Sequence, residues 1–112
     1  MAILMGRLML QLKLLLMNLT EEQLVQIEEL AGLFLNPEEI AVLMDLEAVV
    51  FMELVSLKSG PVYRAYFRGK TVSKKDIHAN VVKMAKHGSP QAEELAREMI
   101  VQQNSAERRA KK

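Results

Sequence analysis

Six cations between residues 58 and 75 are the side chains best suited to chemistry in this sequence. They are Lys58, Arg64, Arg68, Lys70, Lys74 and Lys75. Arg64 precedes Arg68 by four residues, as Lys70 precedes Lys74, so within a helix each pair lies on one surface. Stripes of this kind neutralise phosphates, and phosphate contact supplies much of the affinity for nucleic acid. We interpret the six residues as candidate DNA contacts, with a solvated helix face as the open alternative.

No constellation typical of an enzyme is recognisable. The serines have no His and Asp arrangement that the sequence supports, and there is no Gly-rich phosphate loop with a Walker-type lysine. Asp76 and His78 could share a metal ion, but two neighbouring ligands are common by chance and a stable site needs more. With no cysteine, thiolate sites and disulfides are excluded. The sequence therefore favours a non-enzymatic protein without cofactor or metal.

Charge is divided between the two halves of the chain. Residues 1–56 carry two basic and nine acidic residues, whereas residues 57–112 carry thirteen basic and five acidic ones. The formal net charge is only +1. Such asymmetry indicates contact with nucleic acid or membrane through the basic half. Attraction between the two halves, within or between subunits, explains it equally well.

Two short helices joined by a tight turn are predicted over residues 36–58. Asn36 suits an N-cap, Pro37 suits the first helical position, and the turn falls at Asp45-Leu46. The residues expected to point inward are Ile40, Ala41, Met44, Leu46, Phe51 and Leu54. This pattern is typical of a helix-turn-helix, whose second helix usually enters the DNA major groove.

Further helices are predicted on both sides of this unit. Thr20 and Gln23 form a capping-box pattern that opens a helix from about Glu21 to Phe34, which would complete a three-helix core. A basic helix is expected from Pro61 to about His87, bent near Gly69. After a break at residues 87–90, a last helix is expected to fold back on it as an antiparallel pair.

These elements predict an all-α chain with four parts. They are an apolar arm at residues 1–17, a helix-turn-helix domain at 18–60, a basic helical hairpin for oligomerisation or DNA contact at 61–101, and a basic tail at 102–112. The tail is polar enough to be a frayed helix end or a disordered segment.

The apolar arm is interrupted by Arg7 and Lys13. No apolar run reaches the roughly 20 residues of a membrane span, and charges within the run do not suit a signal peptide. Helical and strand spacing both fit, and helix is favoured. Because such a surface needs a partner, we expect another subunit, and hence a homo-oligomer, rather than a membrane.

Three segments in this order carry a resemblance to a known family. They are residues 36–44 (NPEEIAVLM), 63–70 (YRAYFRGK) and 84–92 (MAKHGSPQA). The second contains an A-Y-x-x-G-K stretch and the third an A-K-x-G-S-x-x-A corner. With this combination, across residues 20–101, the chain resembles the terminase small subunits of tailed phages.

The resemblance implies a non-catalytic DNA-recognition subunit of the viral genome-packaging motor. Such a subunit works as an oligomer in the cytoplasm of the bacterial host cell. It binds double-stranded viral DNA and presents it to the large terminase subunit, which carries the ATPase and the nuclease.

The second helix of the predicted motif departs from that expectation. It carries Glu47 and Glu53, is otherwise mainly apolar, and has no cation before Lys58. Phosphate contact needs cations, and base reading needs Arg, Lys, Asn or Gln at the helix surface. We therefore expect the six cations to make the DNA contact. A protein-interaction module on the same scaffold and a small transcriptional regulator are the alternatives.

Overall fold

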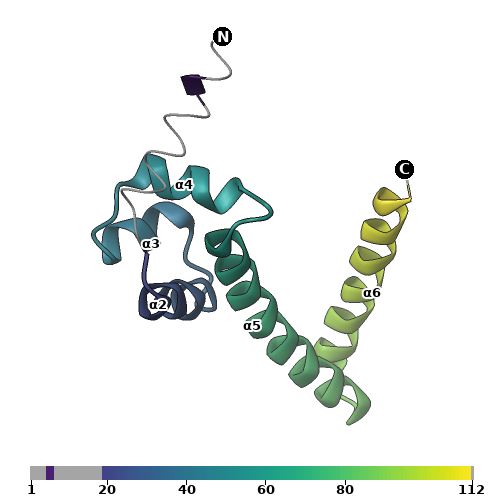
Figure 1. Cartoon of the computed structure of the whole chain (residues 1–112). Helices are drawn as coiled ribbons and strands as arrows, with labels where there is room; N and C mark the ends of the chain where they lie inside the picture. The colour runs from purple at the N-terminus through teal and green to yellow at the C-terminus, as the bar shows by residue number, and fades with distance from the viewer. Residues whose placement is uncertain (1–4, 7–18, 112) are drawn as a thin grey trace. The chain divides into compact units, whose positions relative to one another are not determined.

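The computed structural model describes residues 5–6 and 19–111, and these residues are all-α (Figure 1). The helices between residues 19 and 111 are α2 (Glu21–Ala31), α3 (Pro37–Leu43), α4 (Ala48–Ser56), α5 (Pro61–Lys86) and α6 (Pro90–Ala110). The all-α prediction is confirmed. The predicted arm at residues 1–17, with its choice between helix and strand, lies outside the described residues except for Met5 and Gly6, which are helical.

Side-chain caps set the starts of α2 and α3. The amide of Gln23 donates to Thr20 Oγ1 at 3.2 Å, while the Thr20 amide donates to Gln23 Oε1 at 2.9 Å. Asn36 and Glu39 repeat this arrangement at 2.9 and 3.0 Å. Each box satisfies amides that have no partner within the helix. Both predicted starts are confirmed, and the second box adds a feature that the sequence reasoning overlooked.

Helix α2 ends at Ala31 rather than near Phe34, so its predicted length is corrected. Phe34 has φ 63°, in the left-handed region, and its amide donates to the carbonyl of Ala31 at 2.9 Å. Leu33 and Phe34 are apolar, so the apolar pattern that predicted this helix extends through them in the sequence. In the structure both side chains are exposed, so no packing holds another helical turn.

A tight turn links α3 to α4 where it was predicted. Asp45 has φ 56°, a conformation that Asp tolerates better than most residues, and the Leu46 amide donates to the carbonyl of Ala41 at 2.8 Å. The turn brings Ile40 of α3 and Phe51 of α4 into one core, where both are fully buried. The predicted pair of short helices is therefore confirmed.

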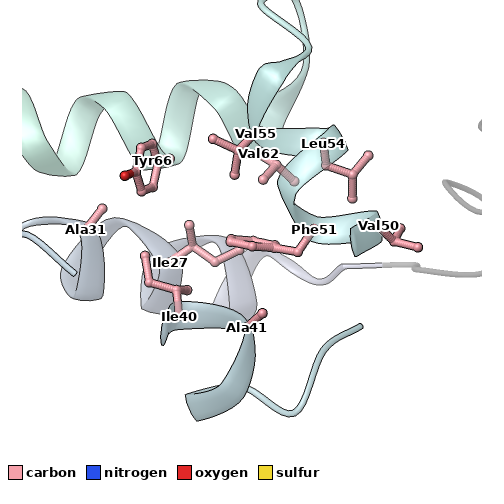
Figure 2. Close-up of a cluster of buried hydrophobic side chains, with 10 residues drawn as sticks. All are labelled: Ile27, Ala31, Ile40, Ala41, Val50, Phe51, Leu54, Val55, Val62 and Tyr66. Atoms are coloured by element: carbon pink, nitrogen blue, oxygen red, sulfur yellow. The ribbon is translucent and has the colours of Figure 1, made fainter. Parts of the chain in front are cut away.

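The core of this region draws on four helices rather than three. Figure 2 shows the ring of Phe51 beside Ile27 of α2, and α5 adds Val62 and Tyr66, which are 3% and 6% exposed. The remaining members are Ala31, Ile40, Ala41, Val50, Leu54 and Val55. Short helices alone bury little surface, so the first turns of α5 complete the core. The compact unit accordingly runs to Ser73, not to the predicted boundary at residue 60.

Gly69 allows the backbone of α5 to lie directly against α2. A methyl group at Gly69 would overlap the carbonyl oxygen of Glu28 and would lie 3.1 Å from Cβ of Ala31. Because glycine has no Cβ, it permits this close approach. Helix α5 continues through Gly69 as one element, and the glycine serves the packing of α5 on α2.

The second compact unit begins at Lys74 and contains the end of α5 and the whole of α6. Between them, Gly88 has φ 93°, and Ser89 Oγ accepts from the amide of Ala92 at 3.3 Å, which caps α6 as predicted. Helix α6 runs to Ala110, so the expectation of a disordered tail from residue 102 is corrected. Arg108 and Arg109 in the last turn suit the negative end of the helix dipole.

Candidate nucleic-acid interface

Four of the six predicted DNA contacts belong to the first unit, which runs to Ser73. Lys58 is exposed in the loop between α4 and α5. Arg64 and Arg68 are exposed one turn apart on α5, and Lys70 is half-buried on the same helix. The fold therefore attaches these cations to a packed core through Val62 and Tyr66 of α5.

Arg64 and Arg68 both have partners within the chain. Arg64 Nη2 donates to the carbonyl of Ser59 at 2.9 Å, which ties the loop to the first turns of α5. Arg68 Nε lies 2.9 Å from Glu28 Oε1, with the two side chains 74% and 33% exposed. An ion pair this accessible to water is worth about 0–1 kcal/mol. A guanidinium has five donors, so each arginine keeps donors for a phosphate.

The Arg68–Glu28 pair bears on the division of charge along the chain. Within residues 5–6 and 19–111 it is the only ion pair that joins the acidic half to the basic half. Attraction between the halves thus engages a single cation of the described chain in a direct ion pair. The other cations of α5 are not matched in this way.

Lys70 lies above two aromatic rings. Its Nζ is 5.0 Å from the ring centre of Tyr66 and 5.2 Å from that of Phe67. A cation over an aromatic face is attracted by the quadrupole of the ring. Tyr66 is a core residue, whereas Phe67 is 40% exposed and stacks on Tyr63 at 4.4 Å between ring centres. The rings restrict Lys70 without neutralising its charge.

Lys74 and Lys75 open the second unit, and both are exposed. Lys75 Nζ lies 3.9 Å from Asp76 Oδ1, a loose pair in which both side chains are mostly in water. Lys74 lines an open hollow between α5 and α6, together with Lys86 and Arg109. The sequence reasoning did not group these three cations, because Arg109 lies on α6, in a segment that was predicted to be a basic tail.

Helix α4 presents no cation to solvent. Phe51 and Leu54 lie in the core, whereas Val49 and Met52 are 60% and 50% exposed. Its one charged residue is Glu53. Such a surface cannot neutralise phosphates, and it has no Arg, Lys, Asn or Gln for bidentate contact with a base. It offers apolar contact instead.

Comparisons with known proteins found no counterpart: no family model, curated protein or solved structure matches the chain. Among the residues that the structure describes, no group of three or more His, Cys, Asp and Glu side chains is placed to hold a metal ion. None of the described helices is both long and apolar enough to span a bilayer. The fold class is all-α, and the exposed cations are the chemical feature from which function can be argued.

Proposed function

We propose that this chain binds double-stranded DNA through backbone charge, as the non-catalytic DNA-recognition subunit of a phage packaging terminase. In that role it would present viral DNA to a large subunit that carries the ATPase and the nuclease. The ordered resemblance of residues 36–44, 63–70 and 84–92 supports this particular role. DNA binding itself rests on one observation: of the six cations, only Arg68 and Lys75 have acidic partners among the described residues.

The proposed binding depends on phosphates rather than bases. Phosphate contacts fix the position of a protein on a duplex but carry no sequence information. The exposed side of α4 has no Arg, Lys, Asn or Gln, which make the bidentate contacts with guanine and adenine, so the sequence preference of this chain should be weak. The contact of Gly69 with α2 fixes the first half of α5 on the core, which keeps Arg64, Arg68 and Lys70 in a constant relation.

Fluorescence anisotropy with a labelled duplex tests the proposal. Binding is titrated at salt concentrations between about 50 and 200 mM, since the logarithm of affinity falls with a slope of about 0.9 per neutralised phosphate. The double variant Lys58→Gln/Lys70→Gln removes two cations that have no acidic partner among the described residues. We expect weaker binding and a slope reduced by about 2.

The matched control is Arg97→Gln, which removes one charge from an exposed position on α6 outside the proposed set. It should leave the salt slope unchanged. DNA binding would be refuted if the intact protein bound no duplex at the lowest salt. Equal slopes in the lysine variant and the control would remove Lys58 and Lys70 from the interface.

The alternative is a protein-interaction module, which the exposed Val49 and Met52 of α4 favour. Met52→Lys tests it, because Met52 is half exposed and the fold should tolerate a charge there. Val50→Lys is its counterpart: Val50 is 3% exposed, so this change buries a charge in the chain's own core and should unfold the first unit. Solution mass and circular dichroism are measured for both.

Under the DNA-binding proposal, Met52→Lys retains the helical signal and the affinity for duplex. A folded Met52→Lys variant of reduced mass would assign α4 to an interface between subunits. Unaltered folding of Val50→Lys would contradict the position of Val50 in the core.

A further inference from the structure

The hollow of the second unit has a distinctive lining. Val82 of α5 and Met99 and Ile100 of α6 supply apolar surface, and Ile100 is 56% exposed. Lys74, Lys86 and Arg109 supply positive charge, and no Asp or Glu of the described chain lines the hollow. The lining thus combines apolar side chains with cations of one sign, and its remaining polar side chains are His78, Gln102, Gln103 and Ser105.

The size of the hollow suits a short helical segment. Its volume is about 1150 Å³. A helix about 10 Å across that rises 1.5 Å per residue occupies roughly 120 Å³ per residue, so the volume of the open hollow exceeds that of one helical turn.

We propose that this hollow binds one amphipathic α-helix of a partner protein, with apolar residues on one stripe and Asp or Glu beside it. The stripe packs against Val82, Met99 and Ile100, and the carboxylates face Lys74, Lys86 and Arg109. This is the helix-in-groove mode, in which apolar anchors at helical spacing supply affinity and flanking charges supply orientation. The assignment goes beyond DNA binding and does not depend on it.

Charge complementarity disfavours a symmetric contact between the hollows of two copies of the chain. If two hollows faced each other, the cations of one copy would meet those of the other, and like charges across an interface repel. Duplex DNA would match the cations, but its phosphate surface would leave Met99 and Ile100 without an apolar partner. An acidic amphipathic helix satisfies both parts of the lining.

Anisotropy with a synthetic peptide tests the inference on the full-length protein. The probe is a labelled helical peptide of about 18 residues, on the order of five turns, with Leu at i, i+3, i+4 and i+7 spacing and Glu elsewhere. A second peptide has Lys in place of every Glu. We expect the Glu peptide to bind at least about tenfold more tightly than the Lys peptide.

Two adjacent residues of α6 provide matched variants. Ile100→Glu places a carboxylate in the hollow, and Val101→Glu places one on a residue that is also exposed but does not line it. Ile100→Glu should lower the affinity for the Glu peptide at least about tenfold, whereas Val101→Glu should leave that affinity unchanged. Both variants should remain helical by circular dichroism, because each residue is more than half exposed.

Three results would overturn the inference. The Glu peptide could fail to bind, or could bind no better than the Lys peptide. The two variants could behave alike. Finally, Ile100→Glu alone could reduce the solution mass of the protein, which would mean that a second copy occupies the hollow. If it instead reduced the affinity for duplex, DNA would be the occupant.

Discussion

Replacing Gly69 by alanine should destabilise the first unit, although alanine is the better helix former. A methyl group there would overlap the carbonyl oxygen of Glu28 and would lie 2.9 Å from the carbonyl carbon. The obstacle is backbone, so no side-chain rotation can relieve it, and α5 must move away from α2. Overpacking costs about 1–3 kcal/mol, and the propensity gain of alanine offsets about 1 kcal/mol. Because the overlapped group is backbone, the overpacking cost should lie at the upper end of that range. After the propensity gain is subtracted, we expect the free energy of unfolding to fall by about 2 kcal/mol.

Urea unfolding followed by tyrosine fluorescence measures this loss. The chain has two tyrosines, Tyr63 and Tyr66, and no tryptophan, so the signal reports the α5 segment that packs on the core. With an m-value of about 2 kcal/mol/M, the midpoint should fall by about 1 M. Thr71→Ala, at an exposed position of the same helix, is the control and should shift the midpoint little. A Gly69→Ala midpoint at or above that of the parent would refute the packing of α5 on α2.

Three further changes can be followed in the same urea titration. Asn36→Ala removes the capping box of α3 and should cost about 1 kcal/mol, and an unchanged midpoint would mean that the cap contributes nothing. Glu47→Ser supplies a side-chain cap that α4 lacks, since Glu47 has extended backbone angles and caps no amide, so it should gain about 0.5–1 kcal/mol. Arg68→Ala breaks a solvent-exposed pair and should cost less than about 1 kcal/mol, while a larger loss would show that the pair holds α5 to α2.

The starts of the helices were predictable because capping is local. Thr20 with Gln23, Asn36 with Pro37, and Ser89 each determine a helix start from residues within one turn. The inward-pointing Ile40, Phe51 and Leu54 were predictable for a related reason, since helical spacing alone places them on one face. Such signals require no knowledge of what lies opposite in space.

The unit boundary and the role of Gly69 were not predictable in this way. The break at Gly60-Pro61 ends a helix, but Val62 and Tyr66 beyond it pack into the preceding core. Gly69 suggested a bend because the sequence shows only a missing side chain, whereas the structure shows the carbonyl of Glu28 in the space it leaves. Both are properties of tertiary contact, which local patterns do not encode.

The candidate site shows the same limit. The cations of α5 could be named from the sequence, yet the Glu28 partner of Arg68 lies on another helix, and the rings beneath Lys70 matter only once α5 is helical. The hollow that joins Lys74 to Lys86 and Arg109 depends on the turn after α5 and on α6 continuing past residue 101. A sequence interpreted as ending in a disordered tail could not contain it.

DNA contact and partner contact place different demands on this chain, and apart from Lys74, which belongs to both proposals, the described residues assigned to them differ. Lys58 and Lys70 lie in the first unit and do not line the hollow, while Ile100 lines the hollow and carries no charge. A subunit that holds DNA for a second protein needs both contacts at once, so neither contact should depend on residues that serve only the other. Lys58→Gln/Lys70→Gln should therefore lose affinity for duplex but keep the acidic peptide, and Ile100→Glu should do the reverse. If one variant lost affinity for both ligands while remaining folded, the two surfaces would be one site. The proposal that duplex and acidic peptide bind to different residues would then be wrong.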